Sequence, residues 1–317
     1  MEFVELGSSG LRASVAGLGC GGSSRLGLGQ GRSMEDAAGI VRAAFERGVN
    51  FLDTAMAYGT EPAIALAGLP RADILISTKS QIFIDGRLIG PDELLANLDA
   101  SLARLGTDHV DIFHLHAVRP EHYGHALMLR ETLERARRSG RIRHIGITET
   151  GPRDPEHLTL ARATLDPAWS VVMVAHHMLN QNSRGTVFPQ TLENRIGTLV
   201  MFAVRAIFSR PERLGEALAE LARAGLIDSA DPAQLDFLME EGGASSLMDA
   251  AYRYARHTPG ADVVLFGTGN VAHLDDNIRS ICAPPLAERA VRRLEERYGH
   301  LVGVGLDLPD HLKTKRG

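Results

Sequence analysis

Four side chains capable of acid–base chemistry occur in order in the first half of the sequence. They are Asp53 and Tyr58 in FLDTAMAYG, Lys79 in ISTK and His116 in DIFHLH. A tyrosine has a pKa of about 10 in water, too high for easy proton exchange at neutral pH. A nearby ammonium group favours the phenolate and lowers that pKa, and a carboxylate behind the ammonium keeps it charged and in place. An imidazole beside the phenol can orient a carbonyl oxygen or share the proton.

Together, these residue types predict a general acid for a carbonyl oxygen that is becoming an alkoxide. The sequence has neither the G-x-S-x-G motif of a nucleophile elbow nor a Walker loop, so it gives little support for acyl transfer or phosphoryl transfer. Taken singly, each residue has an ordinary structural interpretation, such as a turn cap for Asp53 or a half-buried ring for Tyr58. Their joint occurrence after successive predicted strands favours a functional interpretation.

The elements that must position these residues follow a repeated pattern. Short β-branched apolar runs bounded by turn residues predict buried parallel strands, and longer stretches with apolar residues at i, i+3 and i+4 predict helices. We expect eight strands, near residues 15–18, 50–53, 74–78, 110–115, 142–148, 170–175, 198–202 and 262–266. We expect helices between them, near residues 34–47, 62–67, 92–105, 121–138, 155–165, 183–195, 211–224 with 244–257, and 271–280.

Eight strand–helix units without a break in composition predict an α/β fold, a single (β/α)8 TIM barrel over residues 1–317. A small hairpin near residues 3–11 is expected to cap the barrel floor, and residues 286–298 are expected to form an extra C-terminal helix. Residues 226–243 are interpreted as an inserted loop or short helix and residues 304–317 as a mobile tail. In such barrels the chemistry lies at the carboxyl ends of the strands, where the four side chains are predicted to lie.

Several helix boundaries carry their own signals. Ser33 followed by Asp36 is typical of a helix start with a cap and an acidic third residue. Gly48, Gly106 and Gly140 each follow a periodic stretch, which is where a helix end favours glycine. These signals support the predicted boundaries.

Composition limits the class of protein. Lys and Arg number 34 and Asp and Glu 39, so the formal charge is −5; without a basic stripe, a nucleic-acid-binding protein is not expected. No apolar run approaches the roughly 18 residues needed to cross a bilayer, and MEFVELGSSG lacks the basic start and apolar stretch of a secretory signal. With only two cysteines, the sequence predicts a cytoplasmic protein without a disulfide framework.

The motifs that hold the four residues resemble those of the aldo-keto reductases. The resembling stretches are NFLDTAMAYGTE, ISTK and VDIFHLH, and the similarity extends from GLGCGG to LFGTGNVAHLDDN. It implies an NAD(P)H-dependent reductase of an aldehyde, ketone or aldose, or an alcohol dehydrogenase in the reverse direction. Carried over by position, Tyr58 would be the acid, Lys79 and Asp53 would tune it, and His116 would orient the substrate oxygen.

The resemblance also implies a dinucleotide extended across the mouth of the barrel. Thr148 would bind the nicotinamide carboxamide, Phe202 would stack on the nicotinamide, and Asn277 would contact adenine. The N–H groups of a glycine turn that opens a helix would hold a phosphate. The implied cofactor contacts are Gly21, Asp53, Thr148, Phe202, Arg205, Gly267, Thr268, Gly269, His273 and Asn277.

The sequence departs from the family pattern at several of these positions. Members that prefer NADPH often have an arginine where this sequence has His273. Glu149 and Met173 replace an asparagine and a glutamine that commonly accompany the carboxamide. Arg205 stands where a small or apolar residue is common and is interpreted as a phosphate ligand or a substrate contact. Because members of the family commonly use NADPH, the resemblance favours NADPH over NADH.

Two other interpretations remain open. His114 and His116 form an H-x-H pair on one strand face, as in metal-dependent hydrolases on this barrel, although that pair lies on the first strand there and on the fourth here. Further ligands would be His176, His177 and Asp262, and the phenol and ammonium would then have no role.

The second interpretation is a non-catalytic, cofactor-sensing subunit. Binding of NADPH without carbonyl-dependent oxidation would favour it.

Overall fold

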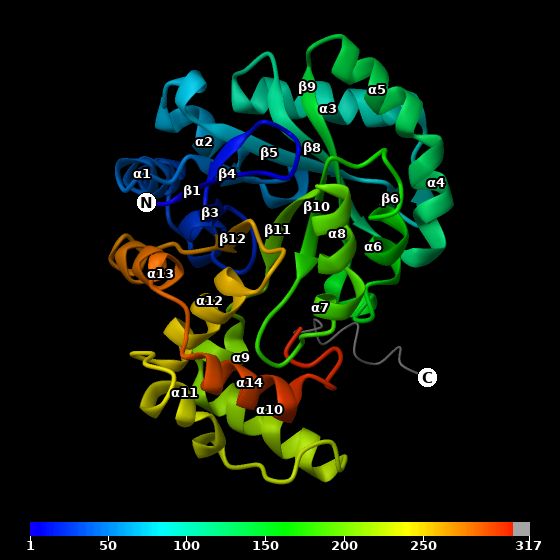
Figure 1. Cartoon of the computed structure of the whole chain (residues 1–317). Coiled ribbons are helices and arrows are strands. Elements are labelled where there is room, and N and C mark those ends of the chain that lie inside the picture. The colour runs from blue at the N-terminus through cyan, green and yellow to red at the C-terminus, as the bar shows by residue number, and fades with distance from the viewer. Residues whose placement is uncertain (307–317) are drawn as a thin grey trace.

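Eight parallel strands close into a barrel, which confirms the predicted fold class (Figure 1). The computed structural model describes residues 1–306. The strands are β3 (Ala16–Gly19), β4 (Phe51–Asp53), β5 (Leu75–Gln81), β8 (Val110–Val118), β9 (Ile142–Glu149), β10 (Val171–Ala175), β11 (Gly197–Met201) and β12 (Val263–Phe266). Each pairs in parallel with its neighbours in this order, and β12 pairs with β3 to close the ring. All eight overlap the predicted strands.

Helices cover the outside of the barrel. They are α1 (Met34–Glu46), α2 (Glu61–Ala67), α3 (Pro91–Leu105), α4 (Tyr123–Met128), α5 (Arg130–Arg138), α6 (Leu158–Ala163), α7 (Ser183–Thr186), α8 (Phe188–Asn194) and α13 (Ala272–Cys282). At the start of α1, the Ser33 hydroxyl accepts from the Asp36 N–H over 3.1 Å, and the Asp36 carboxylate accepts from the Ser33 N–H over 3.0 Å. Gly48, Gly106 and Gly140 have φ of +87°, +65° and +80°, conformations that favour glycine after a helix.

Two predicted helices are each divided in two. The helix expected over residues 183–195 separates into α7 and α8, because Pro189 at the start of α8 has no N–H for a helical hydrogen bond. The helix expected over residues 121–138 separates into α4 and α5 at Leu129. Both pairs still pack on the barrel where a single helix is predicted.

A third predicted helix begins later than expected. The sequence predicts a helix from residue 155, but α6 begins at Leu158, because His157 has a left-handed φ of +59°. The Asp154 carboxylate accepts from the N–H groups of Leu158 and Thr159 over 2.8 and 2.9 Å, so it caps the shortened helix. An unpredicted short hairpin, β6 (Phe83–Ile84) with β7 (Arg87–Leu88), follows β5.

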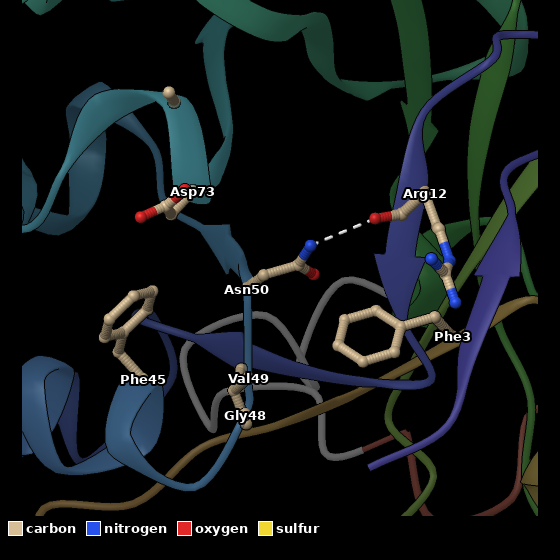
Figure 2. A pocket seen from close by; sticks show the side chains of 8 residues that line it. Phe3, Arg12, Phe45, Gly48, Val49, Asn50 and Asp73 are labelled. Atoms are coloured by element: carbon tan, nitrogen blue, oxygen red, sulfur yellow. Dashed lines mark hydrogen bonds between the residues drawn. The ribbon is translucent and has the colours of Figure 1, made fainter.

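The N-terminal hairpin lies at the floor of the barrel, as predicted. β1 (Phe3–Glu5) pairs antiparallel with β2 (Arg12–Ser14), and the Asn50 side chain donates to the Arg12 carbonyl oxygen over 3.0 Å (Figure 2). A pocket of about 400 Å³ lies beside this contact; its lining residues are Phe3, Arg12, Phe45, Gly48, Val49, Asn50, Ala72 and Asp73. Because Asn50 and Asp73 precede β4 and β5, the pocket lies at the amino ends of the strands, away from the predicted site.

A group of helices lies beside the barrel and has its own apolar core (Figure 1). They are α9 (Ala206–Ser209), α10 (Pro211–Arg223), α11 (Phe237–Glu240), α12 (Leu247–His257) and α14 (Glu288–Tyr298). The first four lie between β11 and β12, and α14 is the predicted C-terminal helix. Residues 226–243, interpreted as an inserted loop or short helix, contain α11 and a 3-10 turn, Pro232–Leu235. Buried leucines such as Leu218, Leu238 and Leu294 join these helices.

The last described residues pack against the barrel. Most of the predicted tail over residues 304–317 lies outside the described residues, but Leu306 is buried and its carbonyl oxygen accepts from Arg205 over 3.3 Å. The Gly303 N–H donates to the Asn180 side-chain oxygen over 2.7 Å. Across residues 1–306, no helix has the length and apolar character needed to span a bilayer.

Candidate active site

Asp53 and Lys79 form a buried ion pair at the carboxyl ends of two adjacent strands, β4 and β5. The Lys79 Nζ lies 2.7 Å from each Asp53 carboxylate oxygen and 2.8 Å from the Thr54 carbonyl oxygen. All three N–H bonds of the ammonium therefore have acceptors. Burial acts to lower the pKa of Lys79, but the Asp53 carboxylate outweighs it, so that pKa lies above its ordinary value and Lys79 stays charged.

Tyr58 lies over this ion pair at the mouth of the barrel. It ends a 3-10 turn that the left-handed Gly59 terminates. The Lys79 Nζ lies 5.3 Å from the centre of the Tyr58 ring, and the Tyr58 hydroxyl lies 3.3 Å from His116 Nε2. Because the donors of Lys79 are engaged elsewhere, Lys79 acts on the phenol through space, and the hydroxyl has His116 as its hydrogen-bond partner.

The expected lowering of the Tyr58 pKa is wrong in its net direction. Burial raises the pKa of Tyr58 and is the largest influence. Lys79 lowers that pKa, as expected, but Asp53 and Cys20 raise it, so the result lies above the ordinary value of 10.0. The physical reason is that the phenolate would form out of water and close to a carboxylate. Tyr58 therefore carries its proton at neutral pH.

His114 and His116 both lie on the inward face of β8. Burial, and after it the Lys79 charge, lowers the pKa of His116 to about 3, so the ring is neutral at physiological pH. A neutral imidazole can offer one N–H or one lone pair to a neighbouring oxygen. His114 is also buried, and a Cβ added to Gly146 would lie 2.2 Å from its Nδ1. Gly146 therefore leaves the space that the His114 ring fills.

A cleft of about 1440 Å³ lies over the carboxyl ends of the strands. Tyr58, His116 and Asp53 line it, and the buried Lys79 completes the group of four that we call the tetrad. All of the predicted cofactor-contact positions also line this cleft: Gly21, Asp53, Thr148, Phe202, Arg205, Gly267, Thr268, Gly269, His273 and Asn277. The structure thus brings the predicted residues to one site, and their individual roles stay predictions.

Phe202 lies at the edge of this cleft in an unusual conformation. Its φ of +70° is left-handed, which is strained for a residue with a side chain. The Arg205 guanidinium lies 4.2 Å from the centre of its ring, and a Cβ on Gly151 would lie 2.8 Å from the ring. Two loops therefore hold the ring in place, and such strain often marks a functional position.

The glycine turn between β12 and α13 fits the phosphate end of a dinucleotide. A Cβ on Gly269 would lie 2.6 Å from Gly27 Cα, and a Cβ on Gly267 would lie 3.2 Å from the Gly19 carbonyl oxygen. A side chain at residue 269 would therefore clash with the loop after β3, and one at residue 267 would lie tightly against the end of β3. The turn leads into the eleven-residue α13, and a helix N-terminus favours a negative group.

The carboxamide end of the predicted site is less polar than the family pattern implies. The Thr148 hydroxyl accepts from the Ala117 N–H over 2.7 Å and keeps its own proton free to donate. Met173 is 3% exposed and contributes a thioether to the cleft. Of Thr148 and Met173, only Thr148 therefore has a polar group that a carboxamide could reach.

The Glu149 carboxylate is buried and takes part in a hydrogen-bond network. Its carboxylate oxygens lie 2.8 and 2.9 Å from His157 Nδ1, and one accepts from the Ala175 N–H over 2.8 Å. His157 Nε2 lies 3.0 Å from the Asn182 side-chain oxygen. The network joins the ends of β9 and β10 to the starts of α6 and α7. Sequence reasoning missed it, because no spacing signals that these residues meet.

The described residues do not form the alternative metal site. His176 bonds to Ser183 over 2.8 Å and to Thr258 over 3.1 Å, so both of its ring nitrogens are engaged. Asp262 lies before β12, at the floor of the barrel, and accepts from the Thr198 N–H over 2.9 Å. Within residues 1–306, no group of three or more His, Cys, Asp or Glu side chains could hold a metal ion. In that part of the chain, the H-x-H pair has no third ligand.

The fold and the cleft define a (β/α)8 barrel protein whose polar site lies over the carboxyl ends of the strands. The model of the aldo/keto reductase family matches residues 18–298, and the chain therefore belongs to this family. The predicted resemblance is confirmed. Members of the family are oxidoreductases that use nicotinamide cofactors on small carbonyl compounds.

Individual relatives support the same assignment. The chain is 26% identical over 295 residues to L-galactose dehydrogenase of Arabidopsis thaliana, which covers 89% of this chain and 88% of that protein. It is 32% identical over 160 residues to 6-dehydroglucose reductase of Novosphingobium aromaticivorans, covering 46% of this chain and 51% of that protein. The structure of an aldo-keto reductase from Bacillus halodurans in its holo form superposes with a TM-score of 0.71 at 21% identity and covers 98% of both chains, which shows the shared fold.

Proposed function

We propose that this protein is an NADPH-dependent reductase of a small carbonyl compound and that Tyr58 is its general acid. One observation carries the proposal. The Tyr58 hydroxyl lies 3.3 Å from His116 Nε2, and the Lys79–Asp53 ion pair lies beneath its ring, all at one cleft. A protonated phenol, a neutral imidazole and a fixed positive charge together suit proton delivery to a carbonyl oxygen.

In the proposed reaction, the neutral His116 holds the carbonyl oxygen beside the Tyr58 hydroxyl. A nicotinamide cofactor, when bound, supplies a hydride to the carbonyl carbon. Tyr58 delivers its proton as the oxygen gains negative charge, and Lys79 stabilises the phenolate that Tyr58 becomes. Asp53 holds Lys79 under the ring. In the reverse direction, the same phenolate accepts the proton of an alcohol.

The choice of NADPH rests on family habit and on the charges along the cleft. Arg32 and Arg210 are exposed, positively charged side chains of the cleft lining. His273, in the first turn of α13, also lines the cleft. The additional phosphate of NADPH would meet this positive charge. We propose that the turn at residues 267–269 holds a phosphate and that Phe202 stacks on the nicotinamide ring.

We propose a polar, hydroxylated substrate such as an aldose. Hydroxyl side chains are frequent in the cleft lining and can hydrogen-bond to sugar hydroxyls; they are Ser23, Ser24, Thr148, Thr150, Ser209, Ser245, Ser246, Thr268 and Ser280. Two relatives are named for sugars, L-galactose dehydrogenase and 6-dehydroglucose reductase. These observations support a sugar-like compound without selecting one.

The proposal is tested in two steps. The purified protein is titrated with NADPH and NADH by fluorescence, and oxidation of the bound cofactor is then followed over a panel of aldehydes, ketones and aldoses. We expect tighter binding of NADPH and oxidation that depends on the carbonyl compound. Tight NADPH binding without oxidation across the panel would contradict a reductase and favour a cofactor-sensing subunit. Activity that a chelator abolishes would instead favour the metal-dependent alternative.

A further inference from the structure

The hydroxyl of Ser77 lies directly beside the Lys79–Asp53 ion pair. Ser77 is fully buried and is the register partner of Asp53 between β4 and β5. Its Oγ donates to Asp53 Oδ1 over 2.8 Å. Because side chains alternate along a strand, Ser77 and Lys79 project to the same inner face of β5. One strand therefore supplies every side-chain hydrogen bond that the Asp53 carboxylate receives in the described structure.

We propose that Ser77 is a positioning residue for the reaction, because its hydroxyl keeps the Asp53 carboxylate ionised and turned toward Lys79, which in turn keeps the ammonium beneath Tyr58. This inference rests on the proposed function of the tetrad. Ser77 does not touch the space that substrate or cofactor would occupy, since it does not line the cleft. Its effect must therefore pass through Asp53 and Lys79.

The carboxylate needs a second donor because it lies out of water. Burial raises the pKa of Asp53, and Lys79 and Ser77 oppose that rise. A hydrogen bond to the charged form of an acid stabilises that form. The Ser77 contact is also directional: it holds Oδ1 on the β5 side, so both carboxylate oxygens can remain 2.7 Å from Lys79 Nζ.

The surroundings contain few competing charges. The titratable groups that face the ion pair from neighbouring elements are Cys20, Tyr58, His114 and His116. Burial raises the pKa of Cys20 and lowers those of the two histidines, so all four groups are neutral at pH 7. The Asp53 carboxylate is therefore the charge that holds the ammonium, and a donor that turns it changes the field at the phenol.

The first measurement is the ionisation of Asp53 itself. The carboxyl carbon of ¹³C-labelled aspartate is titrated by NMR in the wild type and in Ser77→Ala, with the Asp53 signal identified by its loss in Asp53→Asn. We expect the Asp53 midpoint to rise by about one pH unit, which corresponds to about tenfold weaker stabilisation of the carboxylate. An unchanged midpoint would overturn the proposal.

The second measurement is the pH profile of carbonyl reduction. In Ser77→Ala we expect kcat to fall about tenfold and the acid limb of the profile to move to higher pH by about one unit, because the profile reports groups that must be ionised. KM and the NADPH Kd should stay within about twofold, since Ser77 does not line the cleft. An unchanged kcat and profile would overturn the proposal.

Thr78 provides a matched control on the same strand. It is also fully buried, but it projects to the outer face of β5, where its hydroxyl donates to Glu61 over 2.7 Å. Thr78→Val removes a buried hydroxyl without touching Asp53, so we expect a lower thermal midpoint with an unchanged Asp53 titration and pH profile. Equal shifts in Thr78→Val and Ser77→Ala would overturn the proposal, because they would show a general response of the strand.

A conservative variant completes the test. Ser77→Thr keeps the hydroxyl and should restore the wild-type titration and profile, and failure to restore them in a folded protein would overturn the proposal. If circular dichroism shows that Ser77→Ala is unfolded, Ser77→Cys takes its place. The thiol is a weaker donor, so we expect a smaller rise in the Asp53 midpoint. An unchanged midpoint would overturn the proposal. A wild type without any carbonyl-dependent oxidation would contradict the proposed function instead, and the NMR titration would still test the Ser77–Asp53 contact.

Discussion

The charge on Lys79 survives full burial because three acceptors surround it. Two are the Asp53 oxygens and the third is the Thr54 carbonyl oxygen. An unpaired ammonium in such a place would lose several kcal/mol of hydration. With its donors occupied, Lys79 leaves the Tyr58 hydroxyl to His116 while its charge lies 5.3 Å from the ring centre. At the residue scale, the ion pair therefore acts on the Tyr58 hydroxyl through electrostatics rather than through a hydrogen bond.

Replacing Lys79 by methionine should impair both stability and turnover. The variant leaves the Asp53 carboxylate buried without its counter-ion, so we expect a loss of about 3–5 kcal/mol in the free energy of unfolding. We expect kcat to fall by roughly 10²–10⁴, the usual contribution of a positioned acid and its support. Guanidinium unfolding and initial rates of NADPH oxidation measure the two effects.

The double variant Lys79→Met with Asp53→Asn separates these effects. Removing both charges takes away the unpaired carboxylate, so most of the lost stability should return, while turnover should stay low because the phenolate has no positive charge near it. A wild-type rate in either variant would contradict the role given to the ammonium.

At the scale of the elements, the hydrophobic pattern ends before the strands do. The sequence predicts a strand over residues 74–78, but β5 extends to Gln81; it predicts 110–115, but β8 extends to Val118. The additional residues include Lys79 and His116. Polar side chains at the site interrupt the apolar run, although the backbone continues in the sheet. The barrel was therefore predictable from periodicity, and the strand ends at the site were less so.

Other features had no signal along the chain. The Thr54 carbonyl that completes the acceptors of Lys79 is a backbone group, and only the fold determines where it points. Glu149 meets His157, which adopts a left-handed conformation that its residue type does not require. Periodicity predicts which face of an element is buried, but it does not predict side-chain pairs formed across loops.

The Glu149–His157 network should make stability depend on pH. Both ring nitrogens of His157 face acceptors, which favours the charged imidazolium. Burial acts to lower the pKa of His157, but Glu149 and Asn182 outweigh it, so that pKa lies above the ordinary 6.5. A raised pKa in the folded state means that this contribution is fully present below pH 6.5 and is lost as the pH rises through the folded value.

The thermal midpoint should therefore fall between pH 6.5 and pH 9 by more in the wild type than in His157→Asn. Asparagine tolerates the left-handed φ of +59° at this position but does not titrate. Each unit of pKa shift corresponds to about 1.4 kcal/mol, so the difference between the two curves should be of that order. Scanning calorimetry across this range measures it, and parallel curves for the two proteins would show that His157 is not charged in the folded state.

At the scale of the whole molecule, the cleft joins loops from many strands with the inserted helices. Its lining includes Gly21 after β3, Ser246 before α12 and Asn277 in α13. A dinucleotide bound there would contact segments that are far apart in the sequence. Because a dinucleotide would bind the folded chain and not the unfolded chain, it should stabilise the whole barrel.

NADPH should raise the thermal midpoint of the protein. At 100 times its Kd, a ligand that binds only the folded state adds about 2.7 kcal/mol, which for a chain of this size corresponds to a shift of roughly 4 °C. NADH at the same concentration should give a smaller shift, because it lacks the phosphate that would meet the arginine side chains of the cleft lining. Calorimetry with each cofactor measures this, and an equal or larger shift with NADH would contradict the preference for NADPH.

The central claim is that Tyr58 delivers the proton, and Tyr58→Phe tests it by removing a single oxygen atom. Stopped-flow measurement of NADPH oxidation compares the two proteins at saturating carbonyl substrate, with NADPH fluorescence titration as the control for binding. We expect the oxidation rate to fall by roughly 10²–10⁴, the contribution of a positioned general acid, while the NADPH Kd stays within about twofold. Oxidation by Tyr58→Phe at the wild-type rate, with NADPH bound equally well, would contradict the account.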